Sequence, residues 1–189
     1  QIAEYWTLAH SYVLADRMFE SNSGPSFPAH QYLIAGQSDD IPDGPSATPW
    51  GCDAPPGTSE AQLTPSGGLI PGPFPCFSYA TLANELDSKA IDWRYYAPKI
   101  TAPGGVFSAY DAIRDIRYGP DWTQKVRNPE TTVLTDIAAG ELAAVTWVTP
   151  SALNSDHSGT RSGTGPAWVA SVVDAVGNSP YWDSTAIFI

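Results

Sequence analysis

The chain has 189 residues, of which 42% are apolar and 15% are charged, and its 18 prolines and 16 glycines predict long ordered loops in a globular protein. The net charge of −11 and the lack of a basic run argue against nucleic-acid binding, although bound cations would still allow a phosphate ester to bind. No apolar stretch is long enough to predict a transmembrane helix.

The first part of the chain predicts two helices. Apolar residues recur at helical spacing over residues 1–15 and give that segment one buried face. A second helix is predicted with Ser26 as its N-cap, Pro28 in its first turn and Gly36 as its C-terminal stop. A Pro/Gly-rich excursion follows at about 37–77.

The rest of the chain alternates apolar strands with amphipathic helices, which predicts an α/β layered fold with a mainly parallel sheet in one domain, residues 1–189. The predicted strands are 91–96, 143–148 and a last one from Thr185, and 121–129 is predicted as loop. The predicted helices are one with Ser78 as N-cap, one from a Ser108–Asp111 capping box to Ile116, one at 131–138, and one opened by Gly165-Pro166.

Cys52 and Cys76 flank much of the excursion. A disulfide between them would close a loop with little predicted regular structure and would stabilise the fold by roughly 3 kcal/mol. Two unpaired buried thiols are the alternative. A bridge would indicate an oxidising compartment.

Ser26 is the first candidate for chemistry. At a helix N-terminus its hydroxyl would lie among unpaired backbone N–H groups, at the positive end of the helix dipole, where phosphate and other oxyanions bind. Such a hydroxyl becomes a nucleophile once a metal ion or a base lowers its pKa. A serine at this position is also a common helix cap, and local spacing alone favours that interpretation.

A second candidate group, Asn154 to His157, follows the strand at 143–148, at the sheet edge where ligands of open α/β folds bind. Asp156 offers an acceptor that could orient His157 as a donor to a phosphoryl oxygen or a leaving group. A surface turn is the alternative, and spacing alone favours it. His30, one helical turn after Ser26, either faces the same site or packs against the sheet.

Three motifs at separate places in the chain resemble one family. They are Gly24-Pro25-Ser26-Phe27-Pro28-Ala29-His30, Trp147-Val148-Thr149-Pro150 with the following Asn154-Ser155-Asp156-His157, and Gly165-Pro166-Ala167-Trp168-Val169. Together they resemble the bacterial phosphoesterase family, which contains phosphatidylcholine-type phospholipases C and related acid phosphatases and belongs to the alkaline-phosphatase-like superfamily. The resemblance implies an alkaline-phosphatase-like fold.

The resemblance also implies roles for individual residues. Ser26 would be both the nucleophile and a metal ligand, His157 and Asp156 would be catalytic, and His30 and Asn154 would contact the substrate. One or more divalent metal ions of unknown identity are implied as cofactors. Their acidic ligands are expected in segments beyond Gln1 and Ile189, so the chain resembles an internal fragment and is expected to be inactive on its own.

The expected function is therefore hydrolysis of a small-molecule or phospholipid phosphate ester, mono- or diester, by a metal-activated serine in a secreted or periplasmic protein. Two alternatives stay open. One is a metal-independent serine carboxylesterase using Ser26 and His157, against which the missing Gly-x-Ser-x-Gly turn argues. The other is a non-catalytic module that binds carbohydrate or protein through its tryptophans and acidic surface.

Overall fold

The computed structural model describes every residue except 1, 23, 46 and 161–162. Its strands are β1 (Ala61–Leu63), β2 (Leu69–Pro71), β3 (Trp93–Tyr96), β4 (Val126–Arg127) and β5 (Val145–Val148). Its α-helices are α1 (Ala3–Ser11), α2 (Ser26–Ala35), α3 (Leu82–Ser88), α4 (Arg114–Arg117), α5 (Asp121–Gln124), α6 (Thr132–Ala139) and α7 (Gly165–Gly177). Short 3-10 helices are η1 (Gly51–Asp53), η2 (Gly105–Phe107), η3 (Ala109–Ala112), η4 (Ala152–Asn154) and η5 (Trp182–Ser184).

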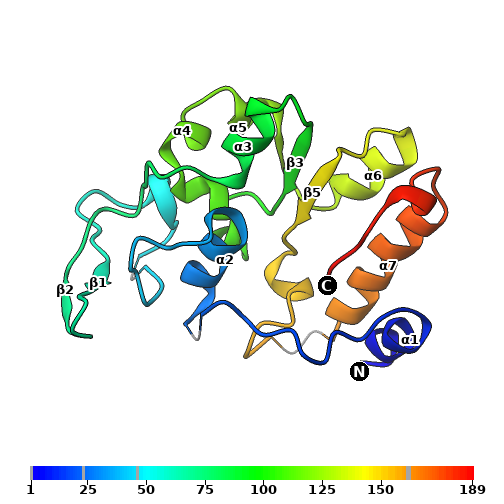
Figure 1. The fold of residues 1–189 in the computed structure, drawn as a ribbon, viewed down its shortest axis with the longest axis horizontal. Helices are drawn as coiled ribbons and strands as arrows, with labels where there is room; N and C mark the ends of the chain where they lie inside the picture. Colours follow the sequence, from blue (N-terminus) through cyan, green and yellow to red (C-terminus); the bar gives the residue numbers. More distant parts are fainter. Residues whose placement is uncertain (1, 23, 46, 161–162) are drawn as a thin grey trace.

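A parallel sheet in the order β4-β3-β5 forms the centre of the fold. In the central strand, Tyr95 lies opposite Val126 of β4 and Trp147 of β5. Figure 1 shows α6 and α7 on one side of this sheet and α2, α3, α4 and α5 on the other. The arrangement confirms the predicted α/β layered fold with a parallel sheet.

The central strand β3 is buried on both faces. Trp93 and Tyr95 belong to one apolar core, which Ile34 of α2 shares, whereas Tyr96 belongs to a second core with Val133 of α6 and Val176 of α7. Successive side chains of a strand point to opposite faces of its sheet. One short aromatic strand therefore anchors both helical layers.

The buried Tyr95 hydroxyl joins three separate segments of the chain. It pairs with Thr149 Oγ1 at 2.9 Å, just after β5, and accepts a hydrogen bond from the Ala109 N–H at 3.0 Å. It also lies 3.3 Å from the carbonyl oxygen of Phe107, to which it can donate. From the other side, Gln31 Nε2 of α2 donates to the Ala109 carbonyl at 3.0 Å. The segment around Phe107 is thus held between α2 and the sheet.

Three predicted helix starts were wrong. Ser26 is the first helical residue of α2 and Pro25 is its N-cap, so the serine hydroxyl is not the cap. Helix α3 has Thr81 rather than Ser78 as N-cap, because Thr81 and Asn84 form a capping box. Ser108 makes no side-chain cap, and the segment after it forms η3 and the four-residue α4 instead of one helix.

Two other segments also differ from the prediction. The range 121–129 contains α5 and β4, so it is not only loop. Residues 185–189 lie in no strand, although Thr185 has extended backbone angles, φ −115° and ψ 131°. An apolar run with extended geometry becomes a strand only where a neighbour supplies hydrogen bonds, and β5 pairs with β3 alone among the described strands.

The predicted disulfide is present: Cys52 and Cys76 are bonded, with their Cα atoms 4.5 Å apart. Between them β1 and β2 form a separate antiparallel pair, with Gln62 opposite Ile70. Both half-cystines are buried against the body of the fold, so the bridge closes the base of the excursion.

We expect Tyr95→Phe to lower the free energy of unfolding by about 1–3 kcal/mol, because it leaves the buried Ala109 N–H without its acceptor. Denaturant titration measures this change. Tyr118→Phe is the matched control, since it removes one hydrogen bond, to the Cys52 carbonyl, from a residue that is 62% exposed. Equal losses in the two variants would contradict a special role for Tyr95.

Candidate active site

Ser26 opens helix α2 at the end of the loop that leads into it. Pro25 precedes it with extended backbone angles, φ −72° and ψ −178°. Within the described part of the chain, the half-buried Ser26 hydroxyl has no hydrogen-bond partner. At the first position of a ten-residue helix it lies beside the unpaired backbone N–H groups and is free to meet a ligand.

His30 lies one turn further along α2, so its side chain shares the helix face of Ser26. The imidazole is stacked on the ring of Phe107, with 5.6 Å between ring centroids and 13° between ring planes. Burial lowers the pKa of His30 to about 4, because a charged imidazole would lose its hydration there. His30 is therefore neutral at physiological pH.

The second candidate histidine, His157, also packs on Phe107. The His157 ring is stacked on Phe107, with 5.4 Å between centroids and 28° between planes. His157 is exposed, and its Nδ1 lies 2.8 Å from the Ser158 carbonyl oxygen. When Nδ1 carries the proton and donates a hydrogen bond to that carbonyl, Nε2 is left as the reactive nitrogen. The fold thus brings together two histidines that are 127 positions apart in the numbering.

Phe107 is the residue that sequence reasoning missed. It lies in the 3-10 helix η2, after Gly104 with φ +93°, where no periodic pattern exists to reveal it. The only sequence signal was the Gly-Gly pair that precedes it. Its ring contacts both candidate histidines and lies 6.5 Å from the Trp50 ring, so it joins the parts of the candidate site.

Asp156 and Asn154 are placed differently. Asp156 Oδ2 accepts a hydrogen bond of 2.6 Å from the Tyr5 hydroxyl, and Asn154 Oδ1 accepts one of 2.7 Å from Thr164 Oγ1. In the described residues, neither side chain is hydrogen-bonded to the imidazole of His157. The His30 and His157 rings are therefore both packed on Phe107, with Ser26 one turn before His30 on α2, whereas Asp156 and Asn154 are bonded to other residues.

A model of the phosphoesterase family matches residues 1–189. The chain belongs to the phosphoesterase family. Membership indicates a hydrolase that acts on phosphate esters, and such enzymes are generally metal-dependent. No described helix has the length and apolar character that crossing a bilayer requires.

The metal dependence of phosphoesterases can be tested against the side chains of this chain. Among the described residues, no three His, Cys, Asp or Glu side chains lie close enough together to hold a metal ion. A catalytic metal in a phosphoesterase needs several such ligands. The described residues therefore do not compose a metal site by themselves, and Ser26 is the one residue that the family resemblance offers as a ligand.

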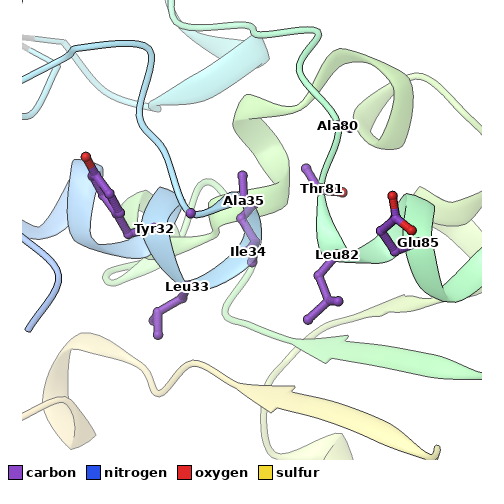
Figure 2. Close-up of a pocket in the computed structure, with 9 residues that line it drawn as sticks. Tyr32, Leu33, Ile34, Ala35, Ala80, Thr81, Leu82 and Glu85 are labelled. Carbon is purple, nitrogen blue, oxygen red and sulfur yellow. The ribbon is translucent and has the colours of Figure 1, made fainter. Parts of the chain in front are cut away.

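A shallow groove lies between the end of α2 and the start of α3, away from the candidate site. Its volume is about 340 Å³, and Tyr32, Leu33, Leu82 and Glu85 are among the residues that line it. Figure 2 shows these side chains spread along the groove rather than converging on one point. None of Ser26, His30 and His157 lines it, so this groove is separate from the candidate site.

A pair of acidic side chains, the half-buried Asp53 and the buried Asp111, lies beside the disulfide. Arg117 donates to both carboxylate oxygens of Asp53, from Nε at 2.5 Å and Nη2 at 2.9 Å, and its guanidinium lies 4.7 Å from the Trp122 ring centroid. Asp111 Oδ1 lies 3.3 Å from the same Nε, although it has no hydrogen-bond partner in the described residues. Gly51, with φ +76°, allows the close approach, because a Cβ there would lie 2.7 Å from Asp111 Oδ2.

The two carboxyls have opposite pKa shifts. Burial, together with the hydrogen bond and the negative charge of Asp53, raises the pKa of Asp111 to about 8. Burial also opposes ionisation of Asp53, but its hydrogen bonds, mainly those from Arg117, outweigh burial and lower its pKa. The pair therefore holds one proton at neutral pH. Through Arg117 it links the disulfide loop to α4.

We expect Asp111→Asn to remove a pH dependence of stability. The folded state holds the Asp111 proton up to about pH 8, whereas the unfolded chain releases it near pH 4. The resulting stabilisation is fully present below about pH 4 and is lost as the pH rises to about 8, by on the order of 1 kcal/mol per pH unit. Unfolding free energies of the wild type and Asp111→Asn at several pH values measure the difference.

Asp115→Asn, at an exposed position, is the control for the loss of a carboxyl. The difference between wild type and variant is the informative quantity, because His30, with its lowered pKa, contributes a dependence of opposite sign below pH 6.5. Parallel pH profiles for wild type and Asp111→Asn would contradict a shared proton at this pair.

Proposed function

We propose that Ser26 is the nucleophile of a phosphate-ester hydrolase and that His157 is its general acid. The observation that carries this proposal is the placement of Ser26 and His30 on one face of α2, with the His30 and His157 rings both packed on Phe107. The helix N-terminus gives the phosphoryl oxygens a positive environment in a chain whose net charge is −11.

In the proposed first step, the Ser26 hydroxyl loses its proton to solvent, Ser26 Oγ attacks phosphorus, and the bond between phosphorus and the leaving-group oxygen breaks. Protonated His157 donates a proton from Nε2 to that leaving oxygen, which departs as an alcohol. Water then attacks phosphorus, the bond between phosphorus and Ser26 Oγ breaks, one water proton passes to His157, and Ser26 Oγ takes a proton from solvent. The neutral His30 would act as a hydrogen-bonding partner of the phosphoryl group rather than as a positive charge.

A divalent metal ion, whose identity is open, belongs to this proposal because a bound cation lowers the pKa of a coordinated hydroxyl. No step is assigned to it here, since the described residues do not make a metal site. The substrate class is a small-molecule phosphate ester or a phospholipid. Asp156 and Asn154 are proposed to support the loop that carries His157, through their hydrogen bonds to Tyr5 and Thr164.

The disulfide is compatible with an extracellular or periplasmic location. We propose that the protein is secreted or periplasmic, because such bridges persist in oxidising compartments. The Cys52–Cys76 bridge joins the base of the excursion and not the candidate site, so it supports the compartment without taking part in the chemistry.

We expect Ser26→Ala to lower kcat for a chromogenic phosphate ester by at least about a hundredfold in the protein that carries this chain, because the covalent step has no other nucleophile. Ser88→Ala is the matched control, since Ser88 is an exposed helical serine whose hydroxyl donates to the Glu85 carbonyl of α3. Circular dichroism and thermal unfolding check that both variants are folded.

The same assay separates the other functions. A carboxylesterase would hydrolyse the matching carboxylic ester in preference and would ignore a chelator of divalent metals, and a binding module would turn over neither ester. If Ser26→Ala keeps more than about a tenth of the wild-type kcat, a loss smaller than about 1.4 kcal/mol, the serine is not the nucleophile.

A further inference from the structure

Helix α1 reaches the loop of the candidate site through one hydrogen bond. The Tyr5 hydroxyl donates to Asp156 Oδ2 at 2.6 Å across 151 positions of sequence. Figure 1 shows α1 beside α7, near the chain termini. Burial and the neighbouring Asp156 raise the pKa of Tyr5 to about 12, so the hydroxyl keeps its proton and stays a donor throughout the working pH range.

Asp156 is held from a second side by helix α7. Its carboxylate lies against Gly165, the first residue of that helix, so closely that a Cβ at Gly165 would overlap the carboxylate. A carboxylate at this end of a thirteen-residue helix is attracted by the helix dipole. Asp156 has φ +52°, a left-handed conformation that a residue with a Cβ adopts at some cost. Such a conformation persists where surrounding contacts determine it.

His157 directly follows this anchored residue. Its backbone N–H donates to Ser155 Oγ at 3.2 Å, and its Nδ1 lies 2.8 Å from the Ser158 carbonyl oxygen. The ring itself is exposed and touches Phe107 on one side. An exposed ring with so few contacts depends on its backbone for its position, and that backbone is held at Asp156.

We propose that Tyr5 is a positioning residue for His157: its hydroxyl fixes Asp156 against the start of α7 and thereby sets the direction of the His157 imidazole. This inference rests on the proposed function for its catalytic consequence. Asp156 then connects α1 and α7 to the loop that contains His157.

The test is Tyr5→Phe, which removes only the donor oxygen. We expect kcat to fall about three- to tenfold with little change in KM, as for the loss of one hydrogen bond that orients a catalytic group. Tyr12→Phe is the matched control, because Tyr12 follows α1, packs its ring on Trp182 and has no hydroxyl hydrogen bond among the described residues.

The second readout is the imidazole NMR spectrum of protein labelled at histidine, with the His157 signals assigned through His157→Gln. Tyr5→Phe should displace the His157 signals and leave those of His30 at their wild-type positions, since His30 is held by α2 and Phe107. Asp156→Asn keeps an oxygen acceptor for Tyr5 and should displace the His157 signals less than Asp156→Ala does.

Unchanged His157 signals in Tyr5→Phe would overturn the inference. Displacement of His30 and His157 together, with a lower unfolding temperature, would also overturn it, because the effect would then be a general loss of packing. A failure of the proposed function is distinguishable from both: Ser26→Ala would keep its activity, while the NMR comparison would still report whether Tyr5 positions His157.

Discussion

The buried hydroxyl of Tyr95 is the constraint on which the site depends. It lies on the central strand and binds the Thr149 side chain, the Ala109 N–H and the Phe107 carbonyl region at once. Thr149 starts the connection toward His157, and the Ala109 carbonyl accepts from Gln31 on the helix that carries Ser26 and His30. The two halves of the candidate site are separated by most of the chain. They meet because Ala109 joins them: its N–H donates to the Tyr95 hydroxyl, and its carbonyl accepts from Gln31.

The two histidines share one aromatic neighbour but differ in environment. His30 is largely enclosed, and burial lowers its pKa to about 4, whereas the His157 ring is exposed. The proposed mechanism uses both histidines: one imidazole that hydrogen-bonds without carrying charge, and one that delivers a proton to the leaving group. Phe107 supports both rings without offering a competing polar group. In this account, the difference in burial and not the residue type assigns the roles.

Much of this arrangement could be predicted from the sequence, and the remainder has identifiable physical causes. The run around Tyr95 was predicted as a strand because it is rich in aromatic residues. Gly36 was predicted as a helix end because glycine commonly ends helices, and it adopts φ +64° there. The pairing of Cys52 with Cys76 followed from the loop they enclose. Phe107 and the Asp53–Asp111–Arg117 cluster could not be predicted, since their partners lie far away in sequence and their segments follow no period. The predicted N-cap of α3, Ser78, was wrong because Thr81 and Asn84 form the capping box that binds the free N–H groups at the start of the helix.

The central claim is that Ser26 carries the phosphoryl group during turnover, and acid quenching with peptide mass spectrometry tests it most directly. The protein is mixed with a phosphate ester, quenched during turnover and digested. The account predicts one added phosphoryl group on the peptide that contains Ser26, assigned to that residue by fragmentation and absent without substrate. Steady turnover with an unmodified Ser26 peptide at every quench time, and the adduct on another residue, would contradict it.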